Sequence, residues 1–334
     1  MKFAPVPLSM RILVAVFEQS FWTLPADEVE RLTRLLPDDH IVHARTPDEL
    51  AAALPDADVL LTARLSREEF ALATRLQWMH SSAAGVGNLL HPELVQSPIP
   101  LTNSRGAHAV PIAEHAIALI LALRRSLHVA LARQHERQWA QIEIYDRLVP
   151  TLDETVLALV GLGAIGSLIA RHASGLGMTV LGVRRDAGAP MPEGVAEVVG
   201  PDGLRDVLSR ADVVVLALPH IPHSRPILGA DEFAVMKRCA LIVNVARGQL
   251  IDDAALAEGL SSGHLGGAGL DAFVPEPLPA SSPLWGLPNV IITPHTAAFG
   301  DNYWRPAVDL FVENVRRFKA GEPLLNVVDK VRGY

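Results

Sequence analysis

Hydrophobic and polar positions alternate along most of the chain with the two periods that strands and helices show. Short apolar runs such as RILVAV (11–16) predict buried strands. Segments such as PADEVERLTRLL (25–36) place apolar residues three and four positions apart and predict helices. Strands and helices that follow one another in this way are typical of a parallel sheet covered by helices.

Two series of this kind follow each other. In the first, we expect strands at 11–16, 40–44, 58–63, 76–82 and 99–103, with helices at 25–36 and 66–76. In the second, we expect strands at 156–161, 179–183, 212–219, 240–246, 267–272 and 290–295, and a final helix at 304–322. The pattern therefore predicts two α/β domains with parallel sheets.

The segment between the two series is different in character. Residues 110–137 predict one long helix, with Pro111 near its start and a very apolar first half. We expect this helix to be buried, either between the domains or against another subunit.

Composition limits the classes of function. A chain of 334 residues with 49% hydrophobic and 20% charged residues is typical of a soluble globular protein of two domains. The net charge of -8 disfavours nucleic acid as a partner. No apolar run reaches the roughly 18 residues of a membrane span, and the start of the chain does not resemble a signal peptide. We expect a cytoplasmic protein with no membrane partner.

The single cysteine, Cys239, excludes a disulfide framework and a thiolate zinc cluster. We expect Cys239 to be a small buried residue before the apolar stretch ALIVNV. The histidines show no pairing with metal-ligand spacing, so no metal site is expected.

A glycine motif follows the first strand of the second series. Gly161, Gly163 and Gly166 have the G-x-G-x-x-G spacing between an apolar strand and a helical pattern. In a dinucleotide site the first glycine allows a tight turn, the second lets the backbone approach the pyrophosphate, and the third lets the helix pack on the strand. The helix N-terminus adds free N–H groups and partial positive charge. An ordinary tight turn is the alternative.

The next strand ends in Arg184, Arg185 and Asp186, where an NAD site usually carries a carboxylate for the ribose hydroxyls. A guanidinium accepts no hydrogen bond but pairs well with a phosphate, so the arginines favour NADP over NAD. Two alternatives stay open. With a longer turn Asp186 takes the ribose role, or the arginines are a solvated basic turn.

Three polar residues follow later strands of the same series. Arg247 follows 240–246, Glu276 lies in the loop after 267–272, and His295 follows the last strand. Residues beyond the carboxyl ends of parallel strands line the crevice where ligands bind. Arginine can bind a 2-oxo acid, and histidine can pass a proton to the carbonyl oxygen while glutamate orients its ring. Taken singly, each is also explained as a surface or buried structural residue.

Other polar residues near these strands are weaker candidates for the site. Asp252 and Asp253 are better explained as the start of a helix. His220 and His223 lie in the loop after 212–219, where they are loop residues or approach the nicotinamide.

Together these segments resemble the D-isomer-specific 2-hydroxyacid dehydrogenase family, of the glyoxylate/hydroxypyruvate reductase type. The resemblance rests on VGLGAIG, ADVVVLALP, LIVNVARGQLIDDAAL, GAGLDAFVPEPLP and SPLWGLPNVIITPH, and more weakly on SSAAGVGNLL. It implies two Rossmann-like or flavodoxin-like domains. The substrate-binding domain would comprise 1–106 and 297–334, with an NAD(P)-binding domain at 107–296 inserted into it.

The resemblance also implies roles for single residues. Arg247 looks like the substrate-binding arginine, Glu276 and His295 look like the acid–base pair, and the Ala84–Gly85 backbone looks like the carboxylate-binding loop. It implies a homodimer as well, with Trp139 able to reach across it. The expected cofactor-binding residues are Gly161, Gly163, Ala164, Ile165, Gly166, Arg184, Arg185, Pro219, Ala246, Asp271 and His295.

The function expected from the residues and the resemblance is NAD(P)-dependent hydride transfer between nicotinamide and a small 2-oxo or D-2-hydroxy acid, with NADP preferred. One alternative is a dinucleotide-sensing binding protein of the corepressor kind, which shares the scaffold. Another is a phosphite-type dehydrogenase, whereas Glu276 argues against the formate type.

Overall fold

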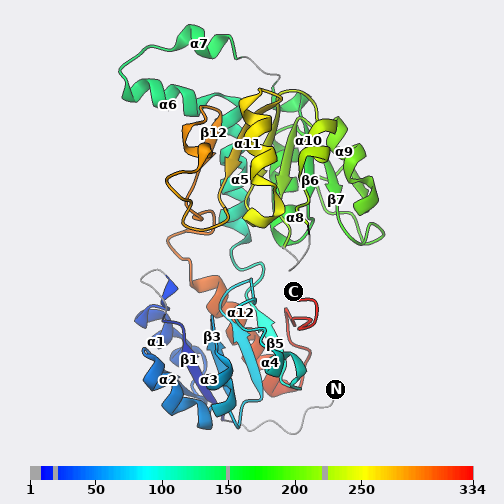
Figure 1. The fold of residues 1–334 in the computed structure, drawn as a ribbon. Coiled ribbons are helices and arrows are strands. Elements are labelled where there is room, and N and C mark those ends of the chain that lie inside the picture. Colours follow the sequence, from blue (N-terminus) through cyan, green and yellow to red (C-terminus); the bar gives the residue numbers. More distant parts are fainter. Residues whose placement is uncertain (1–8, 18–21, 148–150, 220–224, 334) are drawn as a thin grey trace. The chain divides into compact units, whose positions relative to one another are not determined.

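The computed structural model describes residues 9–17, 22–147, 151–219 and 225–333. The chain divides into two compact units (Figure 1). The terminal unit comprises Met1–His108 and Gly300–Tyr334, and the central unit comprises Ala109–Phe299.

The terminal unit is a parallel sheet with helices on both faces. Its five strands lie in the order β2-β1-β3-β4-β5. They are β1 (Arg11–Ala15), β2 (His40–His43), β3 (Val59–Thr62), β4 (Trp78–Ser81) and β5 (Leu101–Asn103). Side chains of α1 (Ala26–Leu35) and α12 (Arg305–Ala320) pack on one face, and those of α2 (Pro47–Ala53), α3 (Arg67–Leu72) and α4 (Pro92–Gln96) on the other. The chain thus completes this unit with its last helix.

The central unit has a seven-stranded parallel sheet in the order β12-β11-β10-β9-β6-β7-β8. The strands are β6 (Val156–Val160), β7 (Thr179–Val183), β8 (Glu197–Val199), β9 (Val213–Leu216), β10 (Ala240–Asn244), β11 (Leu265–Leu270) and β12 (Val290–Ile292). Helices α5 (Ala109–Arg124) and α8 (Ala164–Gly175) cover one face, and α9 (Leu204–Arg210), α10 (Ala230–Val235) and α11 (Asp253–Ser261) cover the other (Figure 1). Short 3₁₀ turns lie at Leu54–Asp56, Leu152–Glu154, Pro201–Gly203, Gly248–Leu250 and Pro283–Gly286.

The strands of the central unit are apolar on both sides because both faces are covered. In β9, Val213 and Val215 pack in the cluster of α5 and α8, whereas Val214 and Leu216 pack in the cluster of α9, α10 and α11. Successive side chains of a strand point to opposite faces, so a fully apolar run is what a doubly covered strand requires. The expected architecture of two parallel-sheet α/β domains is confirmed.

The prediction of one long helix over 110–137 is wrong. The segment forms α5 and α6 (Leu127–His135), which are bent by 72° relative to each other. The chain turns at Ser126, which adopts a left-handed conformation with φ of 51°. Helix α5 buries residues such as Ala113 and Ile120 against the sheet and α8 of its own unit. A short helix, α7 (Gln141–Tyr145), follows α6.

No single helix of the described residues is both long and apolar enough to cross a membrane. Helices α5 and α6 meet that criterion only when taken together as the bent pair.

The expectation that Cys239 is buried is also wrong. Cys239 is exposed, with φ of 61°, in the turn that leads into β10. Its backbone N–H donates to the carbonyl oxygen of His264 at 2.7 Å, which anchors the turn while the thiol faces solvent.

Candidate functional site

The residues singled out in the second half of the sequence follow successive strands of one sheet edge. His295 follows β12, Asp271 and Glu276 follow β11, and Arg247 follows β10. The glycine loop follows β6, and Arg184 follows β7 at the far side. Neighbouring strands are about 4.8 Å apart. The residues that follow these strands therefore form a row along the sheet edge, and an extended dinucleotide fits along this row.

The glycine loop has the geometry that a pyrophosphate cradle requires. Gly161 has φ of 103°, and a Cβ there would lie 2.5 Å from the carbonyl oxygen of Ala217. A Cβ on Gly166 would lie 1.9 Å from the carbonyl oxygen of Gly161. Gly163 differs, because a Cβ there would meet nothing within 4 Å. The first and third glycines are therefore required by the fold, and the second leaves open space above the loop.

That open space lies at the start of helix α8. Gly163 is the N-cap residue and has no side chain that could cap the helix. The first N–H groups of the helix, those of Ala164 and Ile165 among them, therefore have no side-chain cap. A helix N-terminus of this kind binds anions through its free N–H groups and its dipole. The residues present fit the pyrophosphate of a dinucleotide.

The turn after β7 holds its two arginines in different ways. The Arg184 guanidinium donates to the carbonyl oxygens of Ala189 and of Pro190, the latter at 3.1 Å. Arg185 is exposed. The Asp186 carboxylate is also exposed and accepts from the backbone N–H of Gly188 at 3.1 Å. Arg184 therefore shapes the turn, and Arg185 and Asp186 face solvent beside it.

His295 and Glu276 form a hydrogen-bonded pair. Nδ1 of His295 lies 2.7 Å from Oε2 of Glu276, and both side chains are a little over one third exposed. The other carboxylate oxygen accepts from the backbone N–H of Phe273 at 2.9 Å. Because an ionised carboxylate only accepts, Nδ1 carries the proton of this hydrogen bond. Nε2 is then the ring nitrogen that is left to gain or release a proton.

Arg247 follows β10, which is the neighbour of the strand that Glu276 follows. Desolvation by surrounding protein atoms lowers the pKa of Arg247, and the charge of Glu276 opposes the shift. The residue is exposed, and the guanidinium stays charged at neutral pH because the ordinary pKa of arginine lies far above 7. Its Nη1 donates to the carbonyl oxygen of Ala246 at 2.7 Å, which leaves further N–H donors for an anionic ligand.

Asp271 is buried and has several donors around it. Oδ1 accepts from the Thr293 hydroxyl at 2.6 Å and the Thr296 N–H at 2.9 Å. Oδ2 accepts from the Ala297 N–H at 3.0 Å. The carboxylate thus binds both sides of the segment that carries His295.

The loop after β4 in the terminal unit exposes Ala84 and Gly85. The side-chain amide of Asn103 donates to the carbonyl oxygen of Ala84 at 2.7 Å, and the Ser104 N–H donates to that of Ala83 at 3.2 Å. These bonds turn carbonyl groups towards β5. The N–H groups of Ala84 and Gly85 find no acceptor among the described residues, which fits them to bind an anion.

A buried histidine that the sequence patterns did not single out supports this loop. His80 on β4 has Nδ1 at 2.7 Å from the Thr102 hydroxyl and Nε2 at 3.1 Å from the Ser104 hydroxyl. Trp78 donates to the Thr102 oxygen, and Ser104 donates to the carbonyl oxygen of Ser81. Each group is satisfied only when His80 is neutral with its proton on Nε2. Burial lowers its pKa to about 3. In the sequence, the one sign of this buried network is His80 itself, a polar residue inside the apolar run at 76–82.

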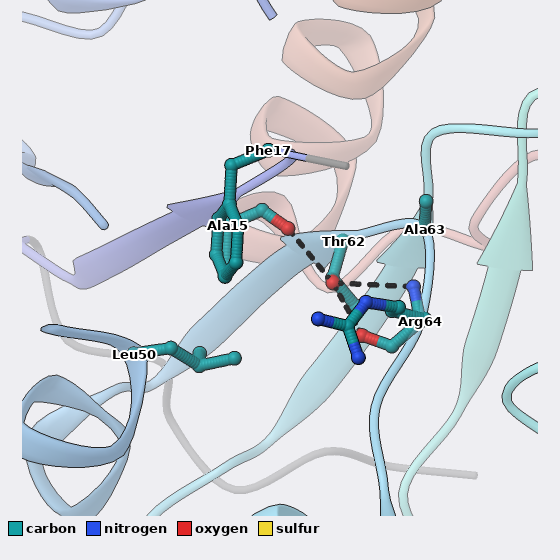
Figure 2. A pocket seen from close by; sticks show the side chains of 6 residues that line it. All are labelled: Ala15, Phe17, Leu50, Thr62, Ala63 and Arg64. Atoms are coloured by element: carbon teal, nitrogen blue, oxygen red, sulfur yellow. Dashed lines mark hydrogen bonds between the residues drawn. The ribbon is translucent and has the colours of Figure 1, made fainter. Parts of the chain in front are cut away.

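The terminal unit also has a small pocket at the carboxyl ends of β1 and β3, where the strand order reverses (Figure 2). It is lined by Ala15, Phe17, Leu50, Thr62, Ala63 and Arg64. The Thr62 hydroxyl lies 2.9 Å from the carbonyl oxygen of Ala15 and 2.7 Å from that of Arg64. Since the backbone already engages this hydroxyl, the pocket presents mainly apolar surface.

The remaining candidates are placed as follows. Pro219 is exposed in the loop after β9, and Ala246 is buried after β10. His220 and His223 lie outside the described residues. Asp252 caps α11 by accepting from the Ala255 N–H at 2.9 Å, as expected. Among the residues that the structure describes, no group of three or more His, Cys, Asp or Glu side chains is arranged to hold a metal ion.

Comparison with known proteins identifies the class. Residues 117–297 match the family model of the D-isomer specific 2-hydroxyacid dehydrogenase NAD binding domain. The chain is 32% identical over 295 residues to a D-3-phosphoglycerate dehydrogenase of Methanocaldococcus jannaschii, covering 85% of this chain but 54% of that protein. The chain therefore belongs to the D-isomer specific 2-hydroxyacid dehydrogenase family, whose members are NAD(P)-dependent oxidoreductases.

Solved structures resemble the whole chain. A D-isomer specific 2-hydroxyacid dehydrogenase from Xanthobacter autotrophicus Py2, in complex with NADPH and MES, is 31% identical with a TM-score of 0.84 and covers 97% of this chain and 100% of its own. An NADPH-dependent glyoxylate/hydroxypyruvate reductase from Sinorhizobium meliloti, in complex with NADP and sulfate, is 28% identical with a TM-score of 0.81 and the same coverage.

Proposed function

We propose that this protein reduces a small 2-oxo acid, such as glyoxylate or hydroxypyruvate, to the corresponding 2-hydroxy acid. The observation that carries the proposal is the hydrogen bond between His295 Nδ1 and Glu276 Oε2, at the same sheet edge as Arg247 and the glycine loop. In this proposal the central unit holds the cofactor and carries Arg247 and the acid–base pair, and the terminal unit carries the donors of Ala84 and Gly85.

A nicotinamide cofactor held at this sheet edge would supply the hydride for the carbonyl carbon. As negative charge develops on the carbonyl oxygen, His295 delivers a proton to it from Nε2, since Nδ1 is engaged by Glu276. The Glu276 carboxylate keeps the ring in this orientation through its hydrogen bond to Nδ1. In the oxidation direction the same nitrogen accepts the proton of the hydroxyl group.

The carboxylate of the substrate needs cationic or N–H donors. Arg247 supplies a guanidinium whose planar fork suits the adjacent carbonyl and carboxylate oxygens of a 2-oxo acid. In the terminal unit, the N–H groups of the exposed residues Ala84 and Gly85 are neutral donors that also suit a carboxylate. We propose Arg247, and separately Ala84 with Gly85, as carboxylate-binding residues, each described within its own unit.

For the cofactor we propose a preference for NADP over NAD. Arg185 stands exposed beside the β7 turn, where a 2′-phosphate would lie, and Arg184 keeps the turn in shape through Ala189 and Pro190. The relatives from Xanthobacter autotrophicus and Sinorhizobium meliloti are described in complex with NADPH and with NADP, which supports the preference. Pro219, Ala246 and Asp271 complete the cofactor-binding set that we propose around the nicotinamide end.

The proposal is tested by steady-state kinetics with NADPH and with NADH against a panel of 2-oxo acids. Phosphite with each oxidised cofactor is included as the competing substrate class. We expect turnover of glyoxylate or hydroxypyruvate, with the higher kcat/KM for NADPH. Oxidation of phosphite without reduction of any 2-oxo acid would replace the proposal. Cofactor binding without turnover of any compound would indicate a sensing protein.

We also propose a homodimer formed through α6 and α7 of the central unit. This arm extends away from the body of the unit (Figure 1). It exposes large apolar side chains, among them Leu131, Ile142 and Trp139, the last at 91%. Clustered exposed apolar residues mark interaction sites, and a second copy offers a matching apolar surface. Light scattering of Leu131→Glu beside the wild type tests this: we expect a monomer for the variant, whereas an unchanged mass contradicts the assignment.

We also propose a cytoplasmic location for the protein. Fractionation of cells that express the protein is the corresponding measurement.

A further inference from the structure

The backbone at His295 is in an uncommon conformation. His295 has φ of 54°, in the left-handed region that residues with a Cβ rarely adopt. Such a residue keeps its conformation only where the surroundings determine it, and such positions cluster at functional sites. The question is therefore which groups of the central unit hold this segment.

The Asp271 carboxylate is the first of these groups. It accepts the Thr293 hydroxyl on one side of His295 and the Thr296 and Ala297 N–H groups on the other, at 2.6 to 3.0 Å. Within the segment, the His295 N–H donates to the carbonyl oxygen of Thr293 at 2.9 Å. The loop is thus closed around a single buried carboxylate.

A second group approaches from helix α5. Nε2 of His115 lies 3.0 Å from the Thr293 hydroxyl oxygen, and 3.7 Å from Oδ1 of Asp271. The Thr293 hydroxyl has one proton, and at 2.6 Å it is donated to the carboxylate, which can only accept. The Thr293 oxygen must therefore accept from His115, so that Nε2 of His115 carries a proton. The donors run in one direction, from His115 to Thr293 to Asp271.

We propose that His115 is a positioning residue for His295, which it holds through Thr293 and Asp271. By fixing the Thr293 hydroxyl, His115 fixes the end of the segment at which the left-handed turn begins. Nε2 of His295 then keeps the place from which it delivers its proton. The inference rests on the proposed role of His295, and it assigns a task to a residue of helix α5 that acts through Thr293 and Asp271.

The alternative is that His115 only stabilises the packing of α5 on the sheet. A purely structural role predicts lower stability with kcat unchanged in the folded fraction. A positioning role predicts that kcat falls while KM for the cofactor is preserved. It also predicts that kcat recovers in variants that keep a hydrogen-bond donor at the position.

Two pairs of variants separate these roles. His115→Leu removes the donor, and His115→Gln keeps an amide N–H at a comparable distance from the helix. Thr293→Val removes the hydroxyl, and Thr293→Ser keeps it. His40→Gln, at an exposed position of the terminal unit, is the matched control for a histidine exchange. Each protein is assayed for kcat and KM and, without ligands, for amide hydrogen exchange of the segment 293–299.

For His115→Leu and Thr293→Val we expect kcat to fall about threefold to tenfold, the effect of one hydrogen bond. KM for NADPH should stay within about twofold. Exchange of the Thr296 and Ala297 amides should become faster, while His115→Gln, Thr293→Ser and His40→Gln stay near the wild type. Unchanged exchange in His115→Leu would overturn the inference, as would faster exchange with unchanged kcat.

The exchange measurement needs no turnover and therefore separates two kinds of failure. A wild type without activity on any 2-oxo acid refutes the proposed function. Protection of the segment still reports whether His115 holds it, and a loss of protection confined to the two donor-removing variants supports that contact on its own.

Discussion

Replacing Gly163 with alanine separates cofactor binding from folding. The new methyl group meets nothing within 4 Å, and the backbone of Gly163, with φ of -81° and ψ of -162°, suits any residue. The cost to the free energy of unfolding is therefore below about 1 kcal/mol. The methyl group would fill the space in which we place the pyrophosphate. Loss of one N–H contact to a charged phosphate costs about 1.5–3 kcal/mol, which raises Kd about 10-fold to 100-fold.

The assay combines titration of NADPH, followed by the fluorescence of the reduced cofactor, with thermal unfolding of the unliganded protein. Gly175→Ala is the matched control, because it lies at the other end of α8 and its Cβ also meets nothing within 4 Å. Gly166→Ala is the opposite case, since its Cβ would lie 1.9 Å from a backbone oxygen. It should unfold at clearly lower temperature, with about 3 kcal/mol lost. Wild-type affinity in Gly163→Ala would refute the placement of the pyrophosphate.

Three further predictions concern the acid–base pair, the cofactor turn and the buried network. Glu276→Gln should lower kcat about tenfold to a hundredfold, measured beside an unchanged KM for NADPH; full kcat would remove Glu276 from the mechanism. Arg185→Ala should raise KM for NADPH about tenfold and leave that for NADH unchanged, and an equal effect on both cofactors would make Asp186 the residue to test. The pKa of His80 is lowered from 6.5 to about 3, so the unfolded chain binds the extra proton between these values. The free energy of unfolding should fall as pH decreases through this range, by at most about 1.4 kcal/mol per pH unit. In His80→Gln, the free energy of unfolding measured with denaturant at several pH values should depend less steeply on pH.

The period of the apolar residues and the spacing of the motifs predicted the strands and loops that carry the site. The strand at 179–183 has the expected bounds, and the other central strands of the sequence pattern lie within their expected segments or overlap them. This succeeded because both faces of each strand are covered and the apolar runs are continuous. The short edge strand β8 (Glu197–Val199) escaped, since only half-buried residues form it.

Other features depend on contacts that a linear pattern does not contain. The bend after α5 lies at Ser126 rather than at a glycine or proline, so no local residue announces it. The exposed position of Cys239 follows from a turn held by the distant carbonyl of His264. Likewise, the bond from His115 to Thr293 joins residues 178 positions apart. Sequence pattern placed Glu276 and His295 at one sheet edge, but the 2.7 Å contact between them is a product of the fold.

The central claim is that His295 delivers a proton while a 2-oxo acid receives hydride from the nicotinamide. It is tested most directly by the kcat of NADPH consumption with glyoxylate or hydroxypyruvate for the wild type and His295→Ala, at equal cofactor occupancy. The account predicts turnover by the wild type and a loss of about 100-fold to 10,000-fold in the variant, the range for a positioned general acid. Equal kcat in the two proteins would contradict it.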